Sequence, residues 1–130
     1  MEKNTSIHVN QILILLFLGF DSMAVYIVNL KFYKGPHEYC GRPSVLGNPY
    51  SHKPGTLAKF KVNSVDEAVE FYGSYIRNEI DNGNIEIINE LKRLRNIKNN
   101  EANLILGCWC FPFTRCHCEV IESIISENIL

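Results

Sequence analysis

Apolar runs and helix-type apolar spacing divide the chain into two strands and three helices. Residues 24–30 form a continuous run rich in β-branched, aromatic and aliphatic side chains. Such a run is typical of a strand that is buried on both faces inside a parallel sheet. Residues 104–109 have the same character. We therefore expect these two segments to form the centre of a sheet.

A capping box marks the start of the first helix. The Ser64 hydroxyl can accept a hydrogen bond from the amide of Glu67, and the Glu67 carboxylate can reach back to the Ser64 amide. The apolar residues that follow recur every three or four positions, as one buried helix face requires: Val65, Ala68, Val69, Tyr72, Tyr75, Ile76 and Ile80. The Asp-Asn-Gly-Asn segment at 81–84 ends this helix.

Two further helices are expected after this break. The second occupies about residues 85–98 and directs four apolar side chains inward: Ile85, Ile88, Leu91 and Leu94. The third occupies about residues 119–128 and has its own apolar stripe: Val120, Ile121, Ile124 and Ile125. Both stripes have the spacing of an amphipathic helix.

The order of these elements predicts a small α/β protein with a short, mainly parallel sheet. The chain runs strand, long loop, helix, helix, strand, Cys-rich loop, helix. Two strands joined through helices should be parallel with a right-handed crossover. The loop at 31–63 is unusually long, which indicates a functional loop or an undetected element; residues 56–62 could hold a short edge strand. At 130 residues the chain supports one domain.

The N-terminal residues 1–22 are interpreted as an extension of a domain that occupies residues 23–130. Lys3, the apolar run 12–20 and the small residues at 22–24 resemble a secretory signal. Nine apolar residues are too few to span a bilayer. A translation start at Met23 is the preferred interpretation, and it implies a cytoplasmic protein. The alternatives are a signal peptide over residues 1–24, hence a secreted protein, or a packed N-terminal element.

Charge and cysteine content limit the possible functions. A formal net charge of -1 gives no electrostatic footprint for nucleic-acid binding. The basic residues at 92–98 lie beside Glu86 and Glu90 and fit a solvated helix face. Four of the five cysteines fall within residues 108–118. An odd, clustered set argues against a disulfide framework and suits ligands, nucleophiles or buried apolar groups in a reducing compartment.

The two irregular loops should meet at one place. Ligands bind at the carboxyl ends of the strands in open α/β sheets, and each loop follows one of the two predicted strands. The first loop contains Arg42, a planar donor fork for a carboxylate, phosphate or base edge, and Asn48, which can donate and accept. The alternative is a rigid turn in which Arg42 pairs with a carboxylate of the fold.

The second loop contains the strongest candidate site. Cys116 and His117 stand at the start of the last helix, where the helix dipole favours a thiolate. Cys116 could act as a nucleophile and His117 as an acid or base. The alternatives are that Cys108 or Cys110 is a small core residue, that Trp109 plugs the end of the sheet, and that His117 lies in water.

A metal site is a separate possibility. The pattern Cys-x-Cys-x5-Cys-His-Cys offers enough ligands for zinc or an iron–sulfur cluster. Cys108, Cys110 and Cys116 with one further ligand form a feasible set. The three consecutive residues 116–118 are not expected to point at one ion.

Two motifs resemble the family called domain of unknown function 4326, which occurs in phages, large viruses and bacteria. The first is Gly-Arg-Pro-Ser-Val-Leu-Gly-Asn-Pro-Tyr at 41–50, and the second is Cys-Trp-Cys-Phe-Pro at 108–112 followed by Cys116 and His117. The resemblance covers about residues 25–125. It implies a fold and a motif location, with Cys118 outside the motif, but it implies no activity.

Two functions are compatible with these observations. In the first, the protein binds or acts on a small nucleotide-like or other anionic metabolite, with Cys116 and His117 catalytic and with four ligand-binding residues: Arg42, Ser44, Asn48 and Cys110. In the second, it is a non-catalytic binding or host-interaction protein that a metal can stabilise. The sequence does not determine the oligomeric state.

Overall fold

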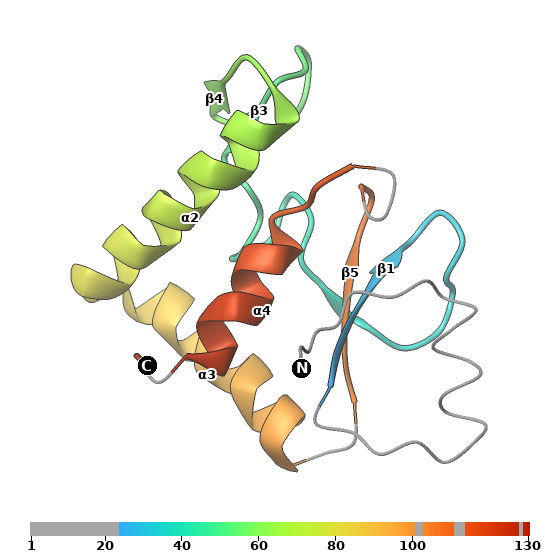
Figure 1. Cartoon of the computed structure of the whole chain (residues 1–130), viewed down its shortest axis with the longest axis vertical. Coiled ribbons are helices and arrows are strands. Elements are labelled where there is room, and N and C mark those ends of the chain that lie inside the picture. Colours follow the sequence, from blue (N-terminus) through green and yellow to red (C-terminus); the bar gives the residue numbers. More distant parts are fainter. Residues whose placement is uncertain (1–23, 101–102, 111–113, 128) are drawn as a thin grey trace.

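A short parallel sheet with helices on one side forms the protein (Figure 1). The computed structural model describes residues 24–100, 103–110, 114–127 and 129–130. The sheet has the order β1-β5-β2, with β1 at Val25–Asn29, β5 at Leu104–Cys108 and β2 at Glu38–Tyr39. All its pairings are parallel, and Ile27 lies opposite Leu106. The predicted small single-domain α/β architecture is thereby confirmed.

Strand β1 is buried on both faces, which explains its continuous apolar sequence. Val25 and Ile27 belong to the main core, whereas Tyr26 and Val28 belong to a second apolar cluster. Because successive side chains of a strand point to opposite faces, a polar residue at any of these positions would be buried without solvent. The continuous apolar pattern therefore correctly predicted that β1 is buried on both faces.

The helices α2 (Val65–Asp81), α3 (Ile85–Asn100) and α4 (Cys118–Ser126) gather on one side of the sheet (Figure 1). In α2 the predicted face packs inward, with Tyr72 and Ile76 fully buried. The helix ends before Asn82, and Gly83 then adopts a positive φ of 77°, a conformation that glycine tolerates best. The predicted break at 81–84 is confirmed.

The apolar face of α3 was predicted partly wrong. Leu91 and Leu94 are buried as expected, but Ile85 is 65% exposed and Ile87 is buried in its place. Ile85 is the first residue of α3 and directly follows the turn after α2. Helix ends are the positions at which periodicity defines the buried face least sharply.

One of the two hydrogen bonds predicted for the capping box of α2 is confirmed. Ser64 Oγ accepts from the amide of Glu67 at 3.1 Å. The Glu67 carboxylate accepts from the amide of Asn63 at 2.8 Å rather than from that of Ser64. The side chain thus reaches one residue further back, while the first turn of the helix remains capped.

The long loop after β1 contains three strands of two residues each. Besides β2, these are β3 at Tyr50–Ser51 and β4 at Phe60–Lys61, which pair with each other in parallel. The sequence predicted an extended piece only around β4. Strands of two residues have no alternation to detect, so β2 and β3 were missed. Among the described residues, none of the helices is long and apolar enough to cross a membrane.

Candidate ligand site beside the cysteine cluster

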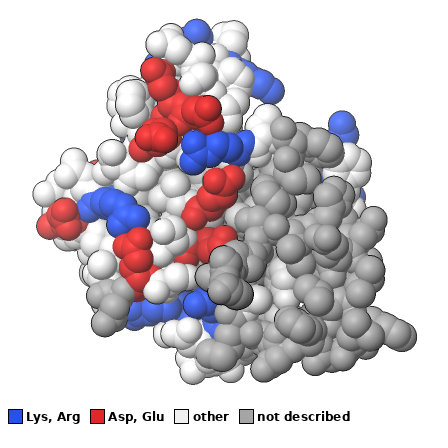
Figure 2. Space-filling view, viewed as in Figure 1, with Lys and Arg blue, Asp and Glu red and all other residues white. Residues whose placement is uncertain are grey.

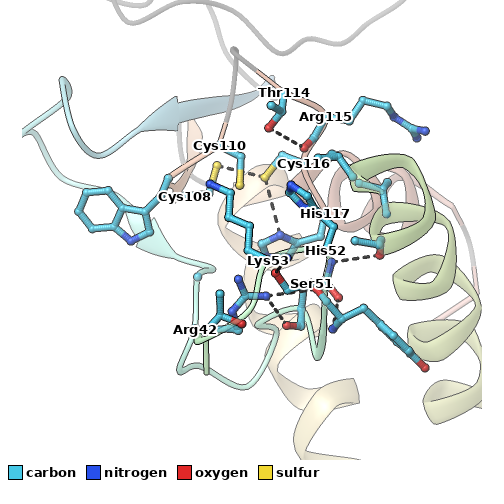
Figure 3. A pocket seen from close by; sticks show the side chains of 18 of the residues that line it. Arg42, Ser51, His52, Lys53, Cys108, Cys110, Thr114, Arg115, Cys116 and His117 are labelled. Atoms are coloured by element: carbon cyan, nitrogen blue, oxygen red, sulfur yellow. Dashed lines mark hydrogen bonds between the residues drawn. The ribbon is translucent and has the colours of Figure 1, made fainter. Parts of the chain in front are cut away.

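A cavity of about 570 Å³ lies where the two irregular loops meet (Figure 3). One wall, the motif wall, comes from residues of the 41–57 segment. The opposite wall, the cysteine wall, comes from residues of the 108–117 segment, and the first turns of α2 contribute Val65, Ala68 and Val69. Because β1 and β5 are parallel, the segments that follow them leave the same edge of the sheet.

Most of the residues singled out from the sequence line this cavity. They are Arg42, Asn48, Cys110, Cys116 and His117. Ser44 does not line it; the Ser44 hydroxyl donates to the carbonyl of Gly41 at 2.6 Å. Ser44 is therefore placed as a residue of the turn.

Arg42 and Asn48 hold the motif wall together. Arg42 Nη1 donates to the carbonyls of Asn48 and Tyr50, at 2.8 and 3.3 Å. Asn48 is buried; its Nδ2 donates to the carbonyl of Ala68 at 3.1 Å, and its Oδ1 accepts from the amide of Tyr50. Both side chains thus shape the loop. The carboxylate partner considered for Arg42 is replaced by backbone carbonyls.

Positive charge collects on the cavity lining. Arg42, Lys53 and Arg115 supply permanent cations, and His52 and His117 add imidazoles. Among the described lining residues, none is Asp or Glu. The outer surface differs, because Figure 2 shows acidic and basic side chains interleaved over the helices. Sequence reasoning missed Lys53 and Arg115, although both lie within or just beyond the two motifs.

Arg115 is a shared cation rather than a free one. Its guanidinium lies 3.3 Å from Asp66, 3.6 Å from Glu119 and 3.9 Å from Glu70. These carboxylates belong to α2 and α4 and are not part of the lining. Arg115 therefore contributes less net positive charge to the cavity than Arg42 or Lys53.

The cysteine wall brings three sulfur atoms together. The Sγ atoms of Cys108, Cys110 and Cys116 all lie within 4.8 Å of one another. Those of Cys108 and Cys116 are 3.1 Å apart, and all the cysteines are free thiols. Cys108 ends β5 and Cys116 precedes α4, so the end of β5 and the start of α4 lie close together. Figure 3 shows the three sulfur atoms side by side.

Hydrogen bonds between the thiols shift their pKa values in opposite directions. Hydrogen bonds from Cys108, Cys110 and Cys118 hold the pKa of Cys116 well below its usual range, against the effect of burial. A hydrogen bond from Cys110 also lowers the pKa of Cys108. The pKa values of Cys110 and Cys118 rise because their protons are the ones donated, to Cys108 first in each case. The close pair Cys108 and Cys116 is therefore the part of the cluster where the thiolate form is favoured.

His117 links the cluster to the first loop. Its Nε2 lies 2.5 Å from the carbonyl of Cys40, and since a carbonyl only accepts, Nε2 must carry hydrogen. Nδ1 then faces Cys116 Sγ at 3.7 Å, and the ring packs edge-on against Tyr72. Burial is the largest single effect and lowers the pKa of His117, but the contacts with Cys116 and with Cys40 together raise it by more, so the net shift is upward. The ring is buried and not in water.

Two expectations about neighbouring residues were wrong. Trp109 does not plug the sheet, because it is 59% exposed and its Nε1 donates to the Tyr39 hydroxyl. The consecutive residues 116–118 do bring their ligand atoms within 4.8 Å of one another. The turn at His117, with φ of -60° and ψ of -18°, curls these side chains together before α4 begins. Cys118 is buried, and its amide lies 3.5 Å from Cys116 Sγ.

The fold and the site define a small parallel α/β protein with a cysteine-walled, cation-lined cavity. Residues 28–127 match the family model described as Domain of unknown function (DUF4326). The match covers well over half of the chain, so the protein belongs to this family. The comparison with curated proteins gave no match, and neither did the comparison with solved structures.

Proposed function

We propose that the protein binds a small anionic ligand of nucleotide-like size in the cavity between its two loops. The observation that supports this most strongly is the lining, which carries Arg42, Lys53 and Arg115 and, among its described residues, no carboxylate. The chain as a whole has a formal net charge of -1. Cations concentrated in a concave site attract anions, because low-dielectric walls focus the field.

The size and the aromatic content of the cavity favour a nucleotide-like ligand. Its volume of about 570 Å³ lies in the range of small-molecule sites. Tyr50 and Trp109 both line it, and Trp109 is largely exposed. Aromatic faces of this kind stack well on a planar ring. A phosphate at the cationic end and a base against an aromatic face would use both features.

The cationic side chains would have different roles. Arg42 is fixed by its Nη1 bonds to two carbonyls, so the rest of its fork is preorganised for an oxyanion. The Lys53 ammonium makes no ion pair or hydrogen bond within the described part of the chain, and its side chain is exposed. It can therefore turn toward a ligand as a mobile point charge. Asn48 would support the site through the loop.

Catalysis by Cys116 and His117 stays a prediction. Cys116 is only 1% exposed and lies against another sulfur at 3.1 Å. A nucleophile must reach its substrate, and this position leaves little room for an approach. The binding proposal does not depend on it.

Calorimetric titration with adenosine 5′-monophosphate, inorganic phosphate and adenosine tests the proposal. We expect the monophosphate to bind more tightly than adenosine, because only the former carries charge for the lining. Lys53→Gln should weaken monophosphate binding roughly tenfold, as expected for one charge-assisted contact. Lys92→Gln, which removes an exposed lysine of α3 outside the cavity, is the matched control. Equal losses in the two variants, or equal affinities for adenosine and its monophosphate, would contradict anion binding in the cavity.

A further inference from the structure

The three sulfur atoms of the cysteine wall have the arrangement of a metal site. Cys108, Cys110 and Cys116 come from the two ends of one short connection, yet their Sγ atoms lie within 4.8 Å of one another. The Sγ atoms of Cys108 and Cys116 are only 3.1 Å apart. We propose that these three cysteines bind a zinc ion whose fourth coordination position opens into the cavity.

The separations fit a single ion. Zinc–thiolate bonds of about 2.3 Å in a tetrahedron place neighbouring sulfurs roughly 3.8 Å apart. The shortest separation here, 3.1 Å, and the upper limit of 4.8 Å lie on either side of that value. Adjustments of a few tenths of an ångström to about one ångström would complete the site. An iron–sulfur cluster fits less well, because its cysteines are divided among two or more iron atoms, and sulfurs bound to different irons stand farther apart.

The fourth position faces the cavity. All three cysteines belong to the cavity lining, and Cys110 is only half-buried. His117 does not complete the set. Its ring nitrogen lies within 4.8 Å of the Sγ atoms of Cys116 and Cys118, but it does not belong to the cluster of Cys108, Cys110 and Cys116. Three protein ligands with one open position are typical of zinc that contacts an exchangeable ligand.

Neighbouring groups support Cys116 as a ligand. The amide of Cys118 lies 3.5 Å from Cys116 Sγ, and His117 Nδ1 lies 3.7 Å from it. The carbonyl of Cys40 fixes the orientation of the His117 ring. Such outer contacts orient a ligand and tune its basicity.

The charges of the metal site and of the cavity are complementary. Three thiolates and one divalent ion leave about one net negative charge at the cysteine wall. Arg42 and Lys53 line the same cavity and can offset that charge. The zinc proposal rests on the sulfur geometry alone, so it stands or falls separately from the binding of an anion.

Metal analysis of the full chain tests the proposal directly. The protein is reduced, loaded with zinc, desalted and analysed for zinc by mass spectrometry. We expect one zinc per chain, and a loss of at least tenfold in affinity in each of Cys108→Ser, Cys110→Ser and Cys116→Ser. Cys40→Ser is the matched control, because it removes a buried thiol outside the proposed set, and it should keep stoichiometric zinc. Loss of zinc in a control that remains folded by circular dichroism would overturn the assignment.

Cobalt substitution of the wild-type chain covers the case in which the serine variants fail to fold. The intensity of the thiolate-to-cobalt charge-transfer band counts the bound thiolates, and we expect three. The visible ligand-field bands should shift when azide is added, because azide can occupy an open position. Four thiolates, no response to azide, or no metal uptake by the reduced protein would each overturn the proposal.

Discussion

The two walls of the cavity are held in place by different interactions. In the motif wall the polar side chains are bonded to backbone groups: Arg42 to the carbonyls of Asn48 and Tyr50, and Asn48 to the carbonyl of Ala68. In the cysteine wall the side chains contact one another, with Cys116 against Cys108 and His117. Substitutions at Arg42 and Asn48 should therefore act mainly on stability, whereas substitutions of the cysteines should also change what the site binds.

Asn48→Ala should have the largest effect on stability. It leaves the amide of Tyr50 without its partner and removes a second hydrogen bond from the carbonyl of Ala68, which keeps its place in helix α2. An unsatisfied buried group costs about 1–3 kcal/mol and a lost hydrogen bond about 1 kcal/mol, so we expect a loss of about 3 kcal/mol in the free energy of unfolding, measured by urea denaturation. Ser44→Ala, in the exposed part of the same turn, is the control. A loss below about 1 kcal/mol in Asn48→Ala would mean that the motif wall does not depend on this residue.

Zinc should stabilise the protein through the cysteine wall. A ligand that binds only the folded state at a free concentration of 100 times its Kd adds about 2.7 kcal/mol. We expect this increase in the wild type and in Cys40→Ser, and none in Cys116→Ser. Thermal unfolding with and without zinc measures it. An equal increase in Cys116→Ser would show that zinc acts elsewhere.

Replacing Arg42 by Lys and Lys53 by Arg tests whether Arg42 stabilises the loop while Lys53 does not. Arg42→Lys removes the fork that bonds two carbonyls, and we expect a loss of about 1 kcal/mol in unfolding free energy. Lys53→Arg keeps the charge at a position without such bonds in the described chain, so stability should change by less than about 0.5 kcal/mol. Denaturation curves measured in parallel decide this. The reverse order of effects would contradict the roles assigned to the two residues.

The smallest effect is expected away from both walls, at the pair formed by Arg77 and Glu127. Hydrogen bonds from Arg77 lower the pKa of Glu127 from its usual 4.5. A lowered pKa in the folded state means that the contribution is present above pH 4.5 and is lost as the pH falls through the folded value. Because both side chains are largely exposed, we expect about 0.5 kcal/mol or less. Glu127→Gln should remove this part of the pH dependence between pH 5 and about 3, whereas an unchanged profile would show that the pair contributes nothing.

The sequence predicts the fold well where residues are buried in a periodic pattern. The stripe of α2, the two central strands and their parallel pairing follow from apolar spacing and element order. Strands β2 and β3 could not be predicted, because two residues carry no period. Ile85 was wrongly predicted to be buried for a related reason, because apolar spacing does not determine which side chains are buried at the end of a helix.

The meeting of the two loops was predicted, but the hydrogen bonds that their side chains make were not. Parallel strands require the two loops to meet, so Arg42 and Cys116 could be expected in one cavity. The hydrogen-bond partners of a side chain depend on tertiary contacts, and these cannot be predicted from the neighbouring residues in the sequence. Asn48 therefore proved to support the loop, and Cys40, alone in the sequence, supplies the carbonyl that orients His117.

Heteronuclear NMR of the reduced chain titrated with adenosine 5′-monophosphate tests the shared cavity most directly. Amide shifts report which residues contact the ligand. We expect the amides of Arg42 and Lys53 on the motif wall, and of Cys110 and Cys116 on the cysteine wall, to shift with one common binding curve. Shifts confined to one wall, or to the exposed basic residues of α3, would contradict the proposal that the two loops form a single ligand site.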